Sequence, residues 1–290
     1  TNQKNKISIL LPDLRGGGAE RVCLDLAYEF KKRGFDVEFV LLNEQGSFLE
    51  EAKNNFSVIS LNVKNIRRSL LSLAKYFKVK VPVVCLASTW PLTVIAPISN
   101  AMSNVSAKIC LIEHNTLSIQ YQNWGRVHQI MMKVSMFISN RMTKYRVGVS
   151  AGVVDDISNI AMMCKSQFKV IYNPIPSKKS ASIQSINKAE KLWKNEKKRV
   201  VSVGSFKAQK NHKLLLQSLL KCNRDTQLMF VGDGDGRDEL EQLAIDLGVA
   251  DRVLFAGFQP DPTPFYETAD LFVLSSNYEG FGNVIVEALA

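Results

Sequence analysis

The sequence predicts an α/β protein of two domains, each built on a doubly wound parallel sheet. Its 290 residues, 46% of them hydrophobic, exceed what one compact core commonly holds. Short apolar runs alternate with amphipathic stretches, as strands and helices do in a parallel sheet. This pattern stops in a stretch rich in Ser, Lys and Asn and then restarts. We therefore expect domains at residues 1–176 and 199–290, with an interdomain linker region that contains some helix at residues 177–198.

The first domain opens with an apolar run at residues 7–11, a glycine loop, and a periodic stretch that ends at Gly34. This order is typical of strand, loop and helix. Further strands are expected at residues 37–42, 83–87, 108–112, 147–149 and 169–171. The uncharged stretch 81–107 has the length of a membrane span. Three prolines interrupt it, so we interpret it as a buried strand, a loop and a core helix.

The second domain repeats the same order of elements. Strands are expected at residues 199–203, 227–231, 252–255 and 271–275, and helices at 212–220, up to about 247, at 263–269 and from about 283. A finished open sheet needs more elements than these. We therefore expect the second domain to be incomplete.

The basic residues are unevenly distributed. Residues 1–178 hold 23 Lys and Arg against 12 Asp and Glu, whereas residues 179–290 hold 14 against 15. An acid-free cluster on an expected amphipathic helix comprises Lys64, Arg67, Arg68, Lys75, Lys78 and Lys80. A solvated helix face is one interpretation, and contact with anionic lipid headgroups or a polyanionic acceptor is the other. No recognition motif accompanies the charge, so we do not expect a nucleic-acid partner.

The five cysteines are odd in number and scattered, without a CxxC pair. This usage fits a reducing compartment and no structural zinc. We expect a cytoplasmic protein, and the lipid hypothesis extends this to peripheral contact at the inner face of the plasma membrane.

The loop after the first strand contains Gly16, Gly17 and Gly18. Bare backbone N–H groups ahead of a helix suit a phosphate, although a plain tight turn explains the glycines equally well. The loop is not GxGxxG, and no acidic residue closes the second strand, with Glu44 only a late candidate. Both absences argue against a nicotinamide-dependent oxidoreductase.

Lys207 and Lys210 follow the strand that ends in Gly204. Two cations in a loop after a strand suit a diphosphate, and a solvated lysine pair is the alternative.

The most informative segment follows the strand at 271–275 and reads EGFGNVIVE, from Glu279 to Glu287. Ligands of open α/β sheets bind beyond the carboxyl ends of the strands, where Glu279 is expected. Its glycines leave room for a ligand, and the main-chain N–H groups of residues 281–284 can meet an anion. The two carboxylates can accept hydrogen bonds from sugar hydroxyls.

Together these features resemble glycosyltransferase family 4, whose members have the GT-B fold of two Rossmann-like domains facing across a cleft. The resemblance covers essentially the whole chain. It rests on the order and spacing of Gly16 to Arg21, Glu113-His114-Asn115, Val149-Ser150, Asn173-Pro174, Val203-Gly204 with Lys210, Gly232-Asp233-Gly234, and the E-x7-E pair Glu279 and Glu287.

The resemblance implies a role for each matched position. Glu279 contacts the donor hexose, Glu287 holds the ribose hydroxyls, and Lys210 neutralises the departing diphosphate. Gly16 and Gly17 correspond to a mobile loop that closes over the diphosphate. The donor site expected in this way comprises Gly16, Gly17, Gly204, Ser205, Lys207, Lys210, Gly280, Phe281, Gly282, Asn283, Val284 and Glu287.

His114, Lys210 and Glu279 are the residues expected to act in catalysis. His114 resembles the histidine beside the transferred sugar, with a general base or a core histidine as alternatives. Asn173 is a weaker candidate at the domain junction. Members of the family usually carry an arginine where this chain has Ser205, and Lys207 is the hypothetical substitute.

The resemblance implies a retaining hexosyltransferase that uses a nucleotide-diphosphate sugar, with UDP the expected carrier, and requires no cofactor or metal. The leaving phosphate then takes the acceptor proton. The expected acceptor is a saccharide or a polyprenyl-diphosphate-linked saccharide used in cell-surface polysaccharide or lipopolysaccharide synthesis. A non-catalytic sugar-nucleotide-binding fragment remains the alternative, because an incomplete second domain weakens the donor site.

Overall fold

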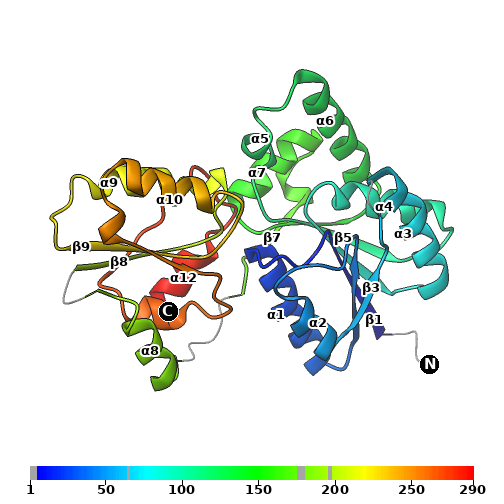
Figure 1. Cartoon of the computed structure of the whole chain (residues 1–290). Coiled ribbons are helices and arrows are strands. Elements are labelled where there is room, and N and C mark those ends of the chain that lie inside the picture. The colour runs from blue at the N-terminus through cyan, green and yellow to red at the C-terminus, as the bar shows by residue number, and fades with distance from the viewer. Residues whose placement is uncertain (1–4, 64–65, 175–179, 195–197) are drawn as a thin grey trace. The chain divides into compact units, whose positions relative to one another are not determined.

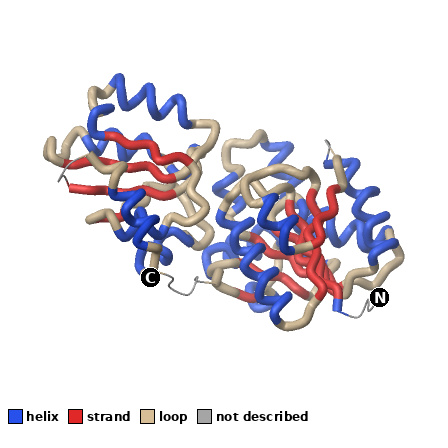
Figure 2. The backbone as a smooth tube through the Cα atoms, turned by 60° about the horizontal axis from the view of Figure 1, so that its bottom comes forward, coloured by secondary structure: helices blue, strands red, loops and turns tan. Residues whose placement is uncertain are grey.

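The computed structural model describes residues 5–63, 66–174, 180–194 and 198–290, without the side chains of Ile66 and Arg67. The chain divides into two compact units, residues 1–174 and 175–290. Each unit contains its own parallel sheet, so the predicted α/β class is confirmed (Figures 1 and 2).

The N-terminal unit is built on a seven-stranded parallel sheet. Its strands are β1 (Lys6–Leu11), β2 (Asp36–Leu41), β3 (Ser57–Ser60), β4 (Val84–Ser88), β5 (Lys108–Glu113), β6 (Tyr145–Gly148) and β7 (Lys169–Val170). They lie in the order β3-β2-β1-β4-β5-β6-β7. The connections reverse direction between β1 and β4, and helices lie on both faces of the sheet (Figure 2).

The helices of this unit are α1 (Gly18–Lys32), α2 (Leu49–Asn55), α3 (Ile66–Lys80), α4 (Leu92–Met102), α5 (Leu117–Gln120), α6 (Arg126–Arg141) and α7 (Ala151–Ala161), with the short helix η2 (Lys165–Gln167). Helices α3, α4, α6 and α7 contact one another in sequence as one layer. The uncharged stretch forms β4 and the buried helix α4, as expected. None of the described helices has the length and hydropathy needed to cross a membrane.

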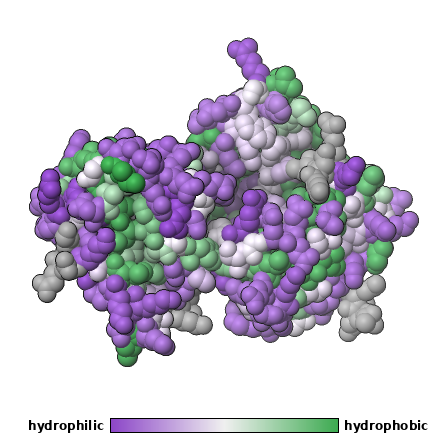
Figure 3. All heavy atoms as spheres, viewed as in Figure 1, coloured by the Kyte–Doolittle hydropathy of each residue, from purple (hydrophilic) through white to green (hydrophobic). Residues whose placement is uncertain are grey.

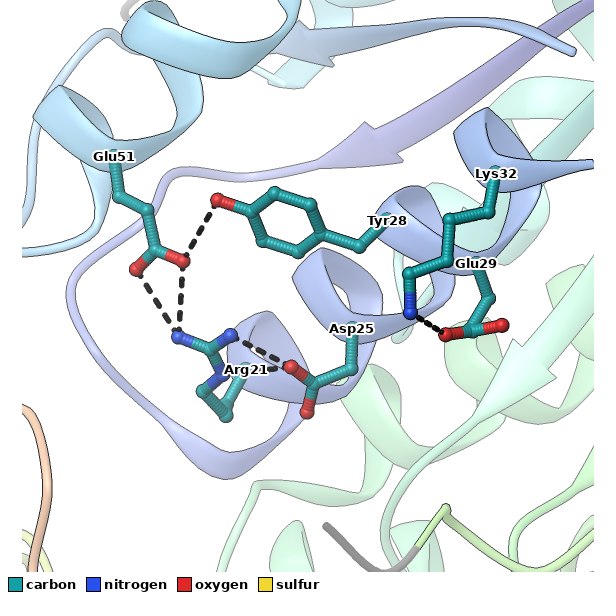
Figure 4. A network of polar contacts seen from close by, with 6 residues as sticks. All are labelled: Arg21, Asp25, Tyr28, Glu29, Lys32 and Glu51. Carbon is teal, nitrogen blue, oxygen red and sulfur yellow. Dashed lines mark hydrogen bonds and ion pairs between the residues drawn. The ribbon is translucent and has the colours of Figure 1, made fainter. Parts of the chain in front are cut away.

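Helix α1 is fixed to α2 by a polar network (Figure 4). The Arg21 guanidinium lies 3.0 Å from a carboxylate oxygen of Glu51 and 2.6 Å from one of Asp25. The Tyr28 hydroxyl donates to Glu51 at 3.2 Å. Arg21, the last residue of the glycine motif, therefore holds in place the helix that begins at the glycine loop.

The C-terminal unit is built on a four-stranded parallel sheet. Its strands are β8 (Lys198–Val203), β9 (Thr226–Val231), β10 (Val253–Gly257) and β11 (Leu271–Phe272), in the order β10-β9-β8-β11. Its helices are α8 (Ile183–Glu190), η3 (Ala208–Lys210), α9 (His212–Leu219), α10 (Arg237–Asp246), η4 (Ala250–Arg252), α11 (Thr263–Glu267) and α12 (Asn283–Leu289). The connections reverse direction between β8 and β11, which neighbour each other.

Two parts of the observed fold differ from the sequence expectations. The expected linker contains α8, which packs on α11, and Ala189 and Trp193 are buried in the core of the C-terminal unit. The Trp193 indole N–H donates to Thr268 Oγ1 at 3.1 Å. These apolar side chains, masked by a polar composition, make residues 183–193 part of that unit. In the N-terminal unit, α2 and β3 lie in a stretch for which no element was expected.

Candidate functional site

The candidate site of the C-terminal unit lies where its strand order reverses. The loops that follow β8 and β11 leave the carboxyl ends of two adjacent parallel strands. In open α/β sheets this reversal is the place where ligands bind. The first loop carries Lys210 and the second carries Glu279, so sequence-distant residues meet at one sheet edge.

Lys210 and Glu279 form a direct ion pair. Lys210 Nζ lies 2.6 Å from Glu279 Oε1, and the two side chains are 15% and 22% exposed. The Ser276 hydroxyl donates to the same carboxylate oxygen at 2.6 Å. An ammonium has three N–H donors and this carboxylate has a second oxygen. The pair is thus oriented by the protein and retains hydrogen-bonding capacity for a ligand.

The two loops are also bound to each other through backbone groups. The Ser275 hydroxyl donates to the Lys210 carbonyl at 2.8 Å. The Asn277 N–H donates to the Gln209 carbonyl at 2.9 Å, and Gln209 Nε2 donates to the Tyr278 carbonyl at 3.0 Å. These bonds fix the backbone on both sides of the ion pair. Its position is therefore set by the loops as well as by the attraction of the charges.

Glycine at position 232 brings the β8 and β9 loops together. Gly232 has φ +146°, and a Cβ placed on it would lie 2.1 Å from the Gly204 carbonyl oxygen. Only a residue without a side chain permits this approach. Gly204 in turn lies against the Lys210 side chain, since a Cβ on Gly204 would be 3.3 Å from Lys210 Cε. Because Gly204 has no side chain, the aliphatic part of the Lys210 side chain can pack against the end of β8.

The remaining residues of the EGFGNVIVE segment continue from Glu279 into α12. Gly280 and Gly282 are buried, Phe281, Asn283 and Val284 are partly buried, and α12 begins at Asn283. Glu287, in the second turn of the helix, accepts a hydrogen bond from the Tyr266 hydroxyl at 3.1 Å. Burial and the Glu287 carboxylate raise the pKa of Tyr266. Glu287 is therefore held by α11 and is partly buried, unlike an ordinary surface glutamate.

Lys207 and Ser205 differ from Lys210 in their surroundings. Lys207 precedes η3 and its side chain is exposed, whereas Ser205 is partly buried next to Gly204. Lys210 thus contacts Glu279, whereas the Lys207 side chain lies at the surface. The proposed substitution of Lys207 for an arginine at position 205 stays a prediction.

In the N-terminal unit, the glycine loop follows β1, next to the reversal of strand order. Gly16 has φ +99°, and Gly17 directly precedes α1. The loop is anchored by Asp13, a buried carboxylate that pairs with Arg15 Nε at 2.8 Å and accepts from Gln45 Nε2 at 3.3 Å. The polar cluster around Asp13 thus holds the loop whose glycines are expected to contact phosphate.

His114 follows β5 at the same edge of this sheet. Both of its ring nitrogens are buried, and no described residue hydrogen-bonds to either. Burial lowers the pKa of His114 to about 4, which makes the imidazole neutral at pH 7. A neutral imidazole has one donor and one acceptor nitrogen for a ligand. A protonated histidine that acts as an acid is disfavoured at this position.

The adjacent Glu113 is a functional candidate that sequence reasoning missed. It is 2% exposed, accepts from Thr93 Oγ1 at 2.5 Å and accepts from the Trp90 N–H at 3.2 Å. Burial raises the pKa of Glu113 to about 7. The sequence placed Glu113 in the Glu113-His114-Asn115 motif, but its contacts with Trp90 and Thr93 could be found only from the fold. Ser276 was missed for a similar reason, because serine alone carries no motif.

Other predicted positions are placed less informatively. Asn173 is buried at the end of the N-terminal unit. On α3, Arg68, Lys75 and Lys78 are exposed, while Lys64 and the Arg67 side chain lie outside the described residues. The described basic side chains of this cluster on α3 are therefore at the surface.

Comparison with known proteins assigns the family. Residues 16–179 match the family model described as Glycosyltransferase Family 4, and residues 184–290 match the model for glycosyl transferases group 1. The first match alone covers more than half of the chain. The chain belongs to glycosyltransferase family 4. Its fold is the one expected from the sequence resemblance.

Two relatives illustrate the extent of similarity. A Campylobacter jejuni enzyme named N-acetylgalactosamine-N,N'-diacetylbacillosaminyl-diphospho-undecaprenol 4-alpha-N-acetylgalactosaminyltransferase is 25% identical over 98% of this chain and 78% of its own. The lipopolysaccharide core biosynthesis glycosyltransferase LpsE of Rhizobium meliloti is 44% identical over 91 residues, which is 31% of this chain and 26% of LpsE.

Solved structures show the same fold. HepE of Anabaena in complex with UDP-glucose has a TM-score of 0.82 at 22% identity, covering 98% of this chain and 78% of that one. Sucrose-phosphate synthase of Thermosynechococcus elongatus has a TM-score of 0.72 at 16% identity, covering 99% and 79%. This family member thus shares its architecture with glycosyltransferases of low sequence identity.

Proposed function

We propose that this family 4 glycosyltransferase is a retaining enzyme. It transfers a hexose or N-acetylhexosamine from a UDP-sugar donor to a saccharide or lipid-linked acceptor. The observation that carries the proposal is the Lys210–Glu279 ion pair at the strand-order reversal of the C-terminal sheet. A fixed cation beside a carboxylate suits a sugar diphosphate, which offers anionic oxygens next to hydroxyl groups.

The chemistry assigned to these residues follows from the charges. Cleavage of the sugar–phosphate bond develops negative charge on the leaving oxygen, and a fixed ammonium stabilises that charge most in the transition state. Lys210 fills this role in the proposal, aided by backbone N–H groups of residues 281–284. Glu279 accepts hydrogen bonds from hexose hydroxyls, and Glu287 from the ribose.

The N-terminal unit has proposed ligand-binding residues of its own. Gly16 and Gly17 offer backbone N–H groups that suit a phosphate, and His114, neutral at pH 7, offers a hydrogen bond to a sugar. The leaving phosphate accepts the acceptor proton, so the new bond forms on the face that the phosphate leaves. Because Lys210 supplies the compensating charge, we propose that no metal is required.

The names of related proteins support the choice of substrates. HepE was crystallised with UDP-glucose, and the Campylobacter relative is named for an undecaprenol-diphosphate-linked acceptor. LpsE is named for lipopolysaccharide core synthesis. We therefore propose a UDP-sugar as donor and a lipid-linked saccharide or lipopolysaccharide core as acceptor, used at the cytoplasmic side of a membrane. The basic cluster on α3 would attract these anionic acceptors.

Calorimetric titration with UDP-, GDP- and ADP-linked hexoses tests the donor assignment. The expected result is tightest binding of a UDP-sugar, unchanged by EDTA. Equal binding of all three nucleotides, or binding that EDTA abolishes, would refute the UDP or metal-free assignment respectively. Once the donor is known, proton NMR of the product tests retention, because it gives the anomeric configuration of the transferred sugar.

A further inference from the structure

His212, the first residue of α9, lies in the hydrophobic core of the C-terminal unit. It is 3% exposed, and its imidazole contacts the rings of Phe206 and Phe230 edge-on, with ring centroids 5.3 and 5.0 Å away. This core lies between the sheet and the helices α9 and α10. Figure 3 shows mainly hydrophilic side chains, in purple, at the surface where Figure 1 labels α10. His212 is therefore a polar ring enclosed among apolar side chains.

The ring nitrogens of His212 are buried, and no group in the described part of the chain makes a hydrogen bond of good geometry to either. Burial lowers the pKa of His212 to about 4; backbone groups of Ser205 and Gly204 oppose this decrease, and the charge of Lys210 adds to it. The imidazole is thus neutral at pH 7 and carries one N–H. Phenylalanine would fill the same space without the cost of burying two nitrogens, so packing alone does not explain this histidine.

The contacts of His212 join the two ends of the loop that carries Lys210. This loop, residues 204–211, connects the end of β8 to the start of α9. His212 directly follows the loop, whereas Phe206 lies near its beginning. The backbone of residues 204 and 205 also lies next to the imidazole. His212 therefore closes the loop at its base.

Phe206 is itself fixed by the glycine-rich loop that follows β9. Its N–H donates to the Asp233 carbonyl at 3.1 Å, and its carbonyl accepts from the Gly236 N–H at 3.2 Å. A Cβ on Gly234 would lie 3.0 Å from the Phe206 nitrogen, and one on Gly236 would lie 2.7 Å from the Phe206 carbonyl oxygen. Residues without side chains permit this approach. The glycine-rich loop thus holds the ring against which His212 packs.

The position of Lys210 depends on the closed loop. Lys210 lies two positions before His212, its stem lies against Gly204, and its ammonium pairs with Glu279 at 2.6 Å. A loop that is open at its base would allow the ammonium to leave this position. Ordering the lysine would then cost free energy at the moment of binding, which a closed loop avoids.

We propose that His212 is a positioning residue of the donor site. Its ring packs on Phe206 and its N–H bonds a backbone carbonyl at residues 204–205, so that the loop holds Lys210 in place for a diphosphate. This inference rests on the proposed function, in which Lys210 meets the diphosphate. Hydrogen bonds in a ligand-free site are often poorly aligned and tighten when the ligand binds. His212 acts through Lys210 and needs no contact with the substrate.

The variant H212F separates the N–H group from the aromatic ring. Phenylalanine keeps the ring packing and removes two buried nitrogens, so H212F should unfold at the same temperature as the wild type or at a higher one. UDP should nevertheless bind about fivefold more weakly, as for the loss of one neutral hydrogen bond. Thermal unfolding and titration calorimetry measure the two effects.

The matched control is Leu219→Ala on the same helix. Leu219 is 3% exposed, belongs to the same core and lies about 10 Å beyond His212 along the helix, away from the loop. L219A should unfold at a lower temperature and bind UDP like the wild type. A purely structural role of His212 predicts no loss of UDP affinity in a variant that is at least as stable as the wild type.

Hydrogen exchange without nucleotide tests the closed loop separately from donor binding. The backbone N–H groups of Phe206, Lys210 and Asn211 are hydrogen-bonded to carbonyl groups. They should exchange faster in H212F than in the wild type, because the loop opens locally more often. In L219A they should exchange at the wild-type rate.

Two results would overturn the proposal. These are wild-type affinity for UDP in H212F, and loop amides of H212F that exchange as slowly as those of the wild type. A wild type that does not bind UDP would instead refute the proposed function on which the inference rests.

Discussion

Lys210 and Lys207 lie three positions apart in the same loop, yet their environments differ. Lys210 is 15% exposed and paired with Glu279, while the Lys207 side chain is exposed. A lysine whose position is fixed in advance loses little conformational freedom when it meets a diphosphate. An exposed lysine loses more, so its contact contributes less.

We therefore expect different losses of UDP affinity when each of the two lysines is replaced. We expect Lys210→Met to weaken UDP binding by about 10- to 100-fold, as for loss of a charged hydrogen bond. Lys207→Met, the matched control, should weaken it by less than about threefold. Titration calorimetry at constant ionic strength measures both. A larger loss in Lys207→Met would assign the diphosphate to Lys207 and support its substitution for the missing arginine at Ser205.

Because the Glu113 carboxyl is buried, we expect the unfolding free energy of the protein to depend on pH. Its pKa is raised by burial from 4.5 to about 7, so between these values the folded protein binds more protons than the unfolded chain. The contribution of Glu113 to stability is therefore present at pH 5 and lost as the pH rises through 7. Relative to Glu113→Gln, which does not titrate, the wild type should lose about 2 kcal/mol of unfolding free energy between pH 5 and 8.

Urea unfolding of both proteins at the two pH values measures this difference. His114 acts in the opposite direction, since its lowered pKa removes stability as the pH falls from 6.5 towards 4. Because His114 is present in both proteins, its effect cancels in the comparison. A pH-independent difference between the two proteins would contradict the assignment.

At the scale of elements, the packing of the β8 and β9 loops depends on Gly232. A methyl group at this position would meet the Gly204 carbonyl oxygen at 2.1 Å on a backbone with φ +146°. Gly232→Ala should therefore lower the unfolding free energy by more than about 2 kcal/mol, from steric conflict and backbone strain together. It should also weaken UDP binding, because Gly204 supports the Lys210 stem.

The control for this substitution is Gly248→Ala. Gly248 also has a positive φ, +65°, but nothing lies within 4 Å of an added Cβ. Its substitution should cost about 1 kcal/mol and leave UDP binding unchanged. Thermal unfolding and calorimetry of the two variants separate backbone strain from loop packing, and equal costs would show that the close approach to Gly204 is unimportant.

The elements that sequence reasoning predicted are those with a strong periodic signal. The strands 7–11, 108–112 and 227–231 are buried apolar runs and reappear with nearly the same bounds as β1, β5 and β9. By contrast, β3 is short and only partly buried, so its sequence carries little signal. In the expected linker, Trp193 and Ala189 are two apolar residues in a polar stretch, so its composition did not reveal that they pack in the core of the C-terminal unit.

At the scale of the whole molecule, sequence motifs located the candidate site but not its geometry. The E-x7-E spacing identified Glu279 and Glu287, yet only the reversal between β8 and β11 explains why Glu279 meets Lys210. The partners Ser276 and Tyr266 come from spatial proximity and not from a motif.

In the proposal, each of the two units of this family 4 member has its own ligand-binding residues. The C-terminal unit contains the ion pair assigned to the donor. The N-terminal unit contains His114 and the glycine loop, proposed to bind sugar and phosphate, and the basic surface of α3, proposed to attract the acceptor. Donor recognition is therefore the part of the proposal that depends most directly on observed contacts.

The most direct test compares UDP with the preferred UDP-sugar on Glu279→Gln by titration calorimetry. The substitution removes the charge that contacts sugar hydroxyls in the proposal and frees Lys210 from its partner. We predict that UDP binds within about threefold of wild type or more tightly, while the extra affinity contributed by the hexose is lost. Equal weakening of UDP and UDP-sugar, or wild-type affinity for both, would contradict the assignment of Glu279 to the sugar.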